Sequence, residues 1–235
     1  MRLRLIALAA SALALLLAGC AELIRIEAPV APPAEFPEGY YQQALKQGKA
    51  IYRVDPAESL VAIEVRRAGS LARLGHDHVV ASHDVTGYIA PEEGRADAYV
   101  ALARMQVDEP ELRKEAGFDT QPTESDIEGT RGNMLNHVLE ADKFPFALIA
   151  VTGADAKDRN ATISVSITLH GHMRTLQVPA EIDADANNIT VAGKLAFNQT
   201  DFGITPYSLL GGAIAVKDGL ELRFRIRAKR LPGAQ

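Results

Sequence analysis

The sequence predicts an all-β fold, a lipocalin-like antiparallel β-barrel of about eight strands with a short helical insertion. Three observations support this prediction. After residue 49, apolar and polar residues alternate with a period of two along most of the chain. Turn-forming residues separate the alternating runs, and the alternation stops only over 107–143. A period of two places every second side chain on one face of a strand, and closing the strands into a ring removes exposed edges. We therefore expect one barrel domain over 49–230.

The clearest strand is the last one, 220–228, which reads Leu-Glu-Leu-Arg-Phe-Arg-Ile-Arg-Ala. Its apolar residues are expected to face the interior of the barrel, and its charged residues are expected to face water. The other alternating runs predict the remaining wall strands. These runs are 50–54, 60–66, 78–89, 98–105, 146–152, 162–169, 176–182 and 188–197. Turn residues lie between them, as in Asp55 and Pro56.

The segment 107–143 is expected to be helical, with helices over 109–116 and 125–139. Pro110 fits the first turn of the first helix, and Ser125 is expected to cap the second. A long insertion in an antiparallel meander is expected to act as a lid, or to pack over an open end of the barrel.

The N-terminus resembles the signal of a bacterial lipoprotein over 1–19. Arg2 and Arg4 precede an apolar run over 5–18, and Cys20 follows. This run is short for a membrane span. Cys20 is therefore expected to be the site of lipid attachment, with an ordinary secretory signal or a membrane anchor as the alternatives. The Pro-rich segment 20–48 is expected to be a flexible tether, with a short helix over 41–46.

This signal implies a lipid-anchored protein of the bacterial cell envelope. Ala21, rather than Asp, follows the cysteine, which favours the outer membrane facing the periplasm. Cys20 is the only cysteine, so no intramolecular disulfide is expected even though export would permit one. The net charge of −5 argues against nucleic acid as a partner. The oligomeric state is left open.

Five motifs then occur in order along the barrel segment. They are Tyr-Arg-Val-Asp-Pro at 52–56 with Ser-Leu-Val-Ala-Ile-Glu-Val at 59–65, Gly87 at the following strand, Lys-Phe-Pro-Phe-Ala-Leu-Ile at 143–149, Ile-Thr-Leu-His-Gly at 167–171, and Thr-Asp-Phe-Gly-Ile at 200–204. Together they resemble the YceI-like family over roughly 52–228. The resemblance implies an extracytoplasmic lipocalin-like barrel that binds a polyisoprenoid lipid without transforming it.

An eight-stranded barrel either fills with side chains or holds one small ligand. The chain has no Trp and the inward positions are mostly aliphatic, so we expect a cavity for an isoprenoid or another hydrophobic small molecule. A solid core is the alternative. The expected ligand-binding residues are Val61, Ile63, Val65, Ile163, Val165, Ile167, Leu195, Phe197, Leu222 and Phe224.

Histidines give a second hypothesis. His76 and His78 share one face if the segment is extended, and His170 and His172 repeat that spacing. Such pairs can bind zinc or copper, so a metal- or haem-binding accessory lipoprotein is the competing interpretation. His76 and His78 could instead contact a lipid headgroup at the barrel mouth. No metal site or cofactor is assigned.

Enzymatic chemistry has little support in the sequence. The chain has no Gly-x-Ser-x-Gly motif and no phosphate-binding loop, and its only thiol is assigned to the anchor. The acidic residues of the helical insertion, including Asp108 and Glu109, are expected to be a solvated surface. The basic residues that alternate along 223–230 are also expected to be solubilising, although they could face an anionic membrane. We therefore predict a binding protein and not an enzyme.

Overall fold

The computed structural model describes residues 31–233. The description concerns the unit that begins at Pro32, as far as residue 233. The expected signal over 1–19 and the anchor at Cys20 lie outside the described residues. Within 31–233, no helix is both long enough and apolar enough to cross a bilayer.

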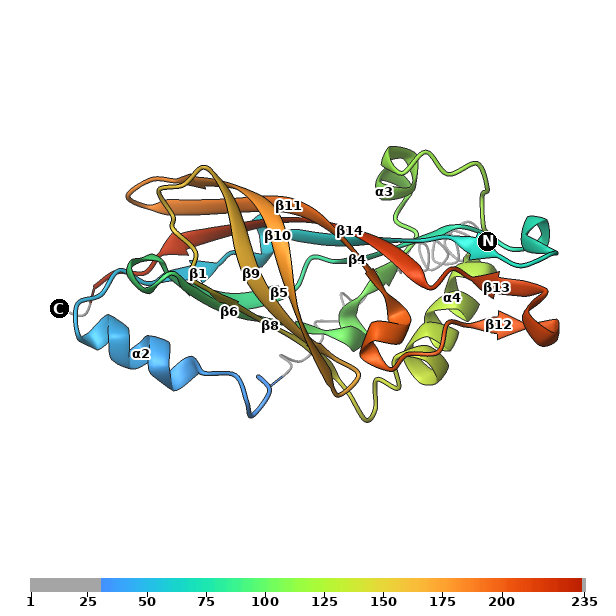
Figure 1. The fold of residues 1–235 in the computed structure, drawn as a ribbon, viewed down its shortest axis with the longest axis horizontal. Coiled ribbons are helices and arrows are strands. Elements are labelled where there is room, and N and C mark those ends of the chain that lie inside the picture. Colours follow the sequence, from blue (N-terminus) through green and yellow to red (C-terminus); the bar gives the residue numbers. More distant parts are fainter. Residues whose placement is uncertain (1–30, 234–235) are drawn as a thin grey trace, which may run out of the picture. The chain divides into compact units, whose positions relative to one another are not determined.

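Eight antiparallel strands form a closed barrel (Figure 1). Around the ring they are β1 (Tyr52–Val54), β5 (Val85–Ala90), β6 (Arg95–Ala101), β8 (Phe146–Thr152), β9 (Asn160–Leu169), β10 (His172–Ala184), β11 (Asn188–Asn198) and β14 (Gly219–Arg230). Pairing of β1 with β14 closes the ring. The structure therefore confirms the predicted barrel.

Three further strands extend the wall at one end of the barrel. They are β2 (Leu60–Val65), β4 (His78–Ser82) and β7 (Gln106–Val107). β14 pairs with β1 near its end and with β2 near its start. Between β1 and β2, Asp55 accepts a hydrogen bond from the Ala57 amide at 3.1 Å, which stabilises a turn over Pro56–Glu58. The single strand expected over 78–89 is thus two strands, β4 and β5.

The last strand has the two faces that its sequence predicts. Leu222 pairs with Leu195, and Phe224 pairs with Gly193. On the other face, the guanidinium of Arg223 forms an ion pair with Glu115. The basic residues of this strand are thus partly neutralised by acidic neighbours. The ion pairs are Arg223 with Glu115, Arg227 with Glu58, and Lys229 with Asp55 and Glu58.

The helical insertion contains α3 (Pro110–Glu115) and α4 (Glu124–Asn133), and α4 continues into a π-helical turn over Met134–Val138. The expected cap at Ser125 is wrong, because Thr123 caps α4. The Thr123 hydroxyl accepts from the Asp126 amide at 3.3 Å, and the Asp126 carboxylate accepts from the Thr123 amide at 2.9 Å. This reciprocal pair satisfies two amides at the start of the helix.

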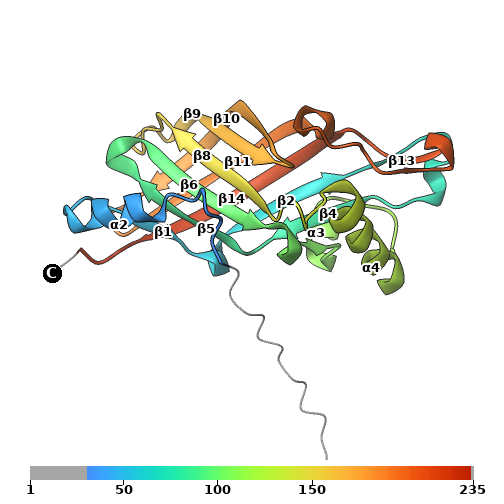
Figure 2. The same ribbon diagram turned by 90° about the horizontal axis from the view of Figure 1, so that it is seen from below.

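A second, three-stranded sheet was not expected. It consists of β12 (Ser208–Leu209), β13 (Ile214–Val216) and β3 (Arg67–Ala68), and it lies beyond the end of the barrel opposite α2 (Figure 2). Strands of two or three residues are too short to show a period in the sequence. The remaining short helical turns span Ala72–Leu74, Pro91–Glu93, Leu102–Arg104, Gln199–Phe202 and Leu210–Gly212.

Helix α2 (Glu38–Lys46) packs against the barrel. Tyr41 is 1% exposed, and its hydroxyl donates to the Asp97 carboxylate at 2.6 Å. The Tyr41 ring also stacks on Tyr88, with 5.1 Å between the ring centroids. The expected tether over 20–48 includes this helix, so the C-terminal part of the tether segment is packed and not extended. Burial of the apolar side of a short helix explains the difference.

Candidate ligand cavity

The barrel encloses a cavity of about 630 Å³, lined mostly by aliphatic side chains. Nine of the ten residues predicted to bind ligand line it. They are Val61, Ile63, Val65, Val165, Ile167, Leu195, Phe197, Leu222 and Phe224. Ile163 does not line this cavity and instead lines a smaller one of about 120 Å³. No ligand is present, so contact with a ligand remains a prediction for all ten.

The burial pattern of β14 shows that the interior is hollow. Leu222, Phe224 and Ile226 point into the barrel, yet each is only half-buried. An inward-facing side chain keeps accessible surface only where nothing fills the space in front of it. The alternative of a solid core therefore does not describe this barrel.

Small residues on the inner wall leave this space. Ala98 and Ala147 both line the cavity. At Gly193, an added Cβ would lie 2.8 Å from the Phe224 ring, so glycine lets that ring lie flat against the wall. The barrel is thus wide enough for a ligand because several wall positions carry little or no side chain.

The smaller cavity lies next to the large one. Ala98, Ile149 and Ile226 line both. These three side chains therefore form a partition between the two spaces. Ile163 and Ile182 line the smaller cavity, and both are buried.

Polar residues of the cavity gather at one end. They come from β3, from the loop before β4 and its first residue, from α4, and from the segment between β11 and β12. They include Arg67, His76, His78, Ser125, Asp126, Thr130, Asn133, Gln199 and Tyr207. Leu74 and Leu209 line the same end and are 62% and 48% exposed. Because cavity-lining residues reach the surface here, this end is the mouth.

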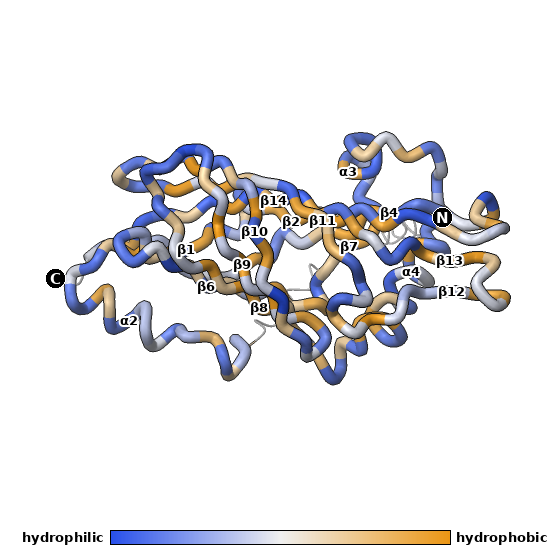
Figure 3. The backbone as a smooth tube through the Cα atoms, viewed as in Figure 1, coloured by the Kyte–Doolittle hydropathy of each residue, from blue (hydrophilic) through white to orange (hydrophobic). Residues whose placement is uncertain are grey.

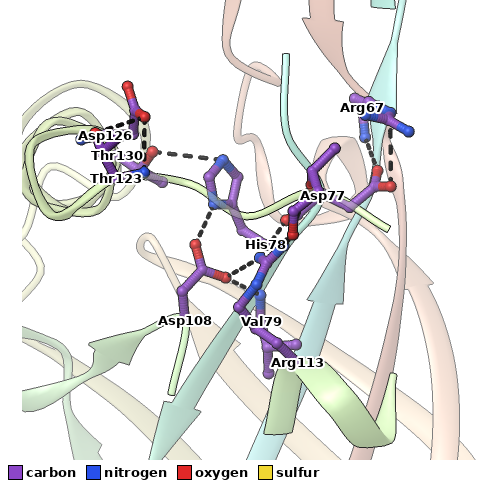
Figure 4. Close-up of polar contacts among 10 residues, drawn as sticks. Arg67, Asp77, His78, Val79, Asp108, Arg113, Thr123, Asp126 and Thr130 are labelled. Atoms are coloured by element: carbon purple, nitrogen blue, oxygen red, sulfur yellow. Dashed lines mark hydrogen bonds and ion pairs between the residues drawn. The ribbon is translucent and has the colours of Figure 1, made fainter. Parts of the chain in front are cut away.

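A buried carboxylate holds the mouth together (Figure 4). Nδ1 of His78 and Oδ2 of Asp108 lie 2.6 Å apart. Oδ1 of Asp108 accepts from the Val79 amide at 3.0 Å and from the Arg113 guanidinium at 2.5 Å. Nε2 of His78 lies 3.4 Å from the Thr130 hydroxyl on α4. The network therefore connects β4 with both helices of the insertion.

Electrostatics keep this carboxylate charged. Burial raises the pKa of Asp108, but hydrogen bonds from His78, the Val79 amide and Arg113 outweigh burial, so its pKa lies below the usual value. An ionised carboxylate can only accept, so Nδ1 of His78 carries the proton. Asp108 also has a φ of +61°, a left-handed conformation that aspartate tolerates better than most residues.

Neighbouring charges fix the adjoining loop. The Asp77 carboxylate accepts from the Arg67 amide at 2.8 Å and lies 3.6 Å from the Arg67 guanidinium. The same guanidinium reaches Asp119 at 3.0 Å. Arg113 donates to the Asp77 carbonyl at 2.6 Å. The loop that carries His76 is therefore anchored on both sides.

The two histidine pairs do not meet. The His76 and His78 rings are perpendicular, with centroids 6.0 Å apart. Nε2 of His170 lies 2.7 Å from the Glu140 carboxylate, while His172 packs against Gly203. In the part of the chain that the structure describes, no group of three or more His, Cys, Asp or Glu side chains is arranged to hold a metal ion.

Sequence reasoning missed Asp108 and Arg113. Asp108 was assigned to a solvated acidic surface and Arg113 was given no role, but the Asp108 side chain is fully buried and Arg113 is 9% exposed. No local pattern distinguishes them from the exposed charges beside them, because their burial depends on β4 packing against the insertion.

Comparison with known proteins agrees with this geometry. The model of the family described as YceI-like domain matches residues 52–228, which covers the whole barrel apart from its last residues. The comparison with curated proteins gave no match.

Two solved structures share the fold. A polyisoprenoid binding domain from Saccharophagus degradans, described as implicated in plant cell wall breakdown, is 14% identical, with a TM-score of 0.56 over 76% of this chain and 97% of that one. BcnA from Burkholderia cenocepacia is 16% identical, with a TM-score of 0.50 over 74% of this chain and 98% of that one. At these identities the likeness concerns the fold.

Proposed function

This chain belongs to the family of YceI-like domains, and from that premise we propose that it binds the hydrophobic tail of an isoprenoid or a similar amphiphilic lipid. The protein holds or carries the lipid without transforming it. One structural neighbour is described as a polyisoprenoid binding domain, which supports this class of ligand.

The observation that carries the proposal is the hollow, aliphatic interior of about 630 Å³. This volume lies in the usual range of small-molecule sites. A tail that buries on the order of 500 Å² would gain about 12 kcal/mol gross, at about 25 cal/mol per Å². Subtracting about 4 kcal/mol for association, the low end of that cost, leaves about 8 kcal/mol, which corresponds to micromolar affinity. Apolar contact alone is therefore sufficient for micromolar binding of the tail.

The polar mouth would receive the headgroup. His78 is already held by Asp108 and Thr130. His76 lines the cavity beside it, and no hydrogen bond joins its ring to another residue within 31–233. Its imidazole can donate or accept, so we assign His76 as the main headgroup contact, with His78 in support.

We place the protein in the bacterial cell envelope, anchored by an acylated Cys20 and facing the periplasm from the outer membrane. The signal-like segment over 1–19 supports this location. Stable anchoring requires more than one acyl chain. Mass spectrometry of the N-terminal peptide from the host protein tests it, because an unmodified cysteine would remove the anchor.

Native mass spectrometry of protein purified from its own host tests the ligand. We expect a stoichiometric lipid that organic solvent extracts, and restored binding when a long-chain prenol is added to the extracted protein. A protein that carries no lipid and fails to bind the prenol at micromolar concentration would contradict the proposal. A stoichiometric metal ion in place of lipid would favour the histidine-based alternative.

A further inference from the structure

Exposed leucines gather at the outer end of the small sheet. We use the name leucine tip for the turn Ala72–Leu74 together with the hairpin of β12 and β13. Of the four large hydrophobic side chains exposed in the described residues, three lie here. They are Leu74, Leu209 and Leu210, which are 62%, 48% and 73% exposed. Figure 3 shows the apolar colouring of the β12–β13 hairpin.

The two parts of the leucine tip are held side by side. The Leu71 amide donates to the Ala213 carbonyl at 2.8 Å, and Ala215 of β13 pairs with Ala68 of β3. At Gly69, an added Cβ would lie 2.4 Å from the Ala213 carbonyl oxygen. Glycine at 69 therefore allows the close approach that presents the leucines as one surface.

Leu210 occupies a position that is unfavourable for leucine. Its φ is +50°, in the left-handed region where glycine and asparagine are preferred. Its side chain is also the most exposed of the large apolar groups. Neither the backbone nor the packing of this chain explains a leucine here, which points to a contact outside the chain.

The leucine tip is continuous with the cavity. Leu74 and Leu209 line the cavity and are also largely exposed. Ile214 and Tyr207 lie on the same stretch of the lining. An apolar path therefore runs from the interior of the barrel to the exposed leucines.

The charge around the leucine tip is opposite to that of the whole protein. The chain has a net charge of −5, yet the segments 66–75 and 204–217 contain four basic residues and no Asp or Glu. Arg66 and Arg67 form ion pairs. Arg73 and Lys217 are exposed, and neither forms an ion pair with any residue in 31–233.

We infer that the leucine tip docks into the surface of an anionic lipid bilayer, with its leucines in the acyl boundary and Arg73 and Lys217 at the headgroups. Exposed apolar side chains flanked by unpaired cations are the combination that such a surface binds. The inference goes beyond ligand binding, because it assigns the place where the mouth meets the membrane. A lipid would then pass between bilayer and cavity without crossing water.

The absence of tryptophan from the chain allows a direct test in the full-length protein. Leu210→Trp places a sole fluorophore on the leucine tip, at a residue that does not line the cavity. Ala196→Trp places it on the exposed outer face of β11 as the matched control. Both proteins are reconstituted in vesicles of phosphatidylglycerol and phosphatidylcholine, and far-ultraviolet circular dichroism verifies that each is folded.

We expect a blue-shifted emission from Leu210→Trp and several-fold stronger quenching by brominated acyl chains than from Ala196→Trp. Adding Arg73→Glu and Lys217→Glu to Leu210→Trp should abolish the difference, whereas adding Arg225→Glu, on the barrel wall, should preserve it. Equal accessibility of both tryptophans to an aqueous quencher would overturn the inference and would leave a protein partner as the occupant of the leucine tip.

The result of the quenching experiment can be distinguished from the result of the prenol-binding test of the proposed function. A cavity-filling Ala147→Phe in the Leu210→Trp protein should leave the quenching unchanged. If Leu210→Trp is quenched but the protein with an unfilled cavity, carrying Ala147, binds no prenol, the lipid cargo is refuted and the docking surface is kept. Prenol binding without quenching would keep the lipid cargo and refute the docking surface.

Discussion

The imidazole of His78 and the carboxylate of Asp108 lie 2.6 Å apart and join the barrel wall to the helical insertion. His78 is the first residue of β4, and Asp108 directly follows β7, two residues before the first helix of the insertion. Since Arg113 of α3 and Thr130 of α4 extend the same network, one buried carboxylate positions both helices of the insertion, of which α4 lines the mouth.

Asp108→Asn should destabilise the fold by about 3 kcal/mol, because it leaves the buried Arg113 without a full counter-charge. Urea unfolding monitored by circular dichroism measures the change. Glu109→Gln is the control. Glu109 pairs with His83 at 3.0 Å on the surface, and loss of such a pair costs about 1 kcal/mol or less. Equal changes in unfolding free energy for the two substitutions would contradict a structural role for Asp108.

The contribution of Asp108 should depend on pH in the acid range. Its pKa in the folded protein lies below the ordinary value of 3.8, so the folded state favours the ionised form. The stabilisation is therefore full above pH 3.8 and is lost as the pH falls through the lower, folded value. The difference in unfolding free energy between the wild type and Asp108→Asn should shrink over that interval. A difference that persists undiminished at still lower pH would contradict this assignment.

Tyr41→Phe should weaken the attachment of α2 to the barrel. The variant loses the bond to the Asp97 carboxylate, although Arg95 still donates to Asp97 at 2.7 Å. A hydrogen bond to a charged group contributes about 1.5–3 kcal/mol. Hydrogen exchange should report loss of protection in Glu38–Lys46. Tyr88→Phe, which removes a longer bond of 3.3 Å to Glu38, should have the smaller effect.

Alkaline pH should weaken the contact between Tyr41 and Asp97. Burial first, and then the bond and charge of Asp97, raise the pKa of Tyr41 above its ordinary value of 10.0. The folded state therefore favours the neutral phenol, and this stabilisation is complete below pH 10.0 and is lost as the pH rises further. The wild type should lose stability relative to Tyr41→Phe above pH 10.0, as measured by thermal unfolding. Parallel pH profiles of stability for the wild type and Tyr41→Phe would contradict this prediction.

Ala147→Phe should reduce prenol binding at least tenfold while leaving the barrel folded. Ala147 lines the large cavity, so the new ring occupies empty space and displaces the ligand. Ala196→Phe adds the same ring on the exposed outer face of β11 and should bind prenol normally. Fluorescence titration with a prenol analogue measures both. Unchanged affinity in Ala147→Phe would place the ligand elsewhere.

Ile149→Ala should favour longer prenyl chains. Ile149 separates the large cavity from the small one, and its truncation joins the two at a stability cost of about 2–5 kcal/mol. Ile167→Ala is the matched control, because Ile167 lines only the large cavity. Competition between prenols of different length should shift toward the longer one in Ile149→Ala alone. A shift in both variants would assign the effect to added volume rather than to the partition.

Sequence alone determined the wall of this barrel. Residues 146–152 form the strand β8 within the predicted limits, and the apolar faces of β9, β11 and β14 point inward as their period requires. Alternation is a local property, because each strand has one apolar face and one polar face whichever strands it pairs with. Closure of the ring needs in addition the pairing of β1 with β14, which joins Tyr52–Val54 to the last residues of the barrel.

Tertiary structure alone decided what the wall encloses and what closes it. Whether Val165 and Leu222 meet other side chains or empty space depends on how many residues project into the same volume, and no single strand contains that information. The burial of Asp108, the packing of Tyr41 and the pairing of β3 with β13 likewise depend on residues far apart in the chain. The faces of the strands are therefore encoded locally, while the cavity, its mouth and the leucine tip arise only when distant segments meet.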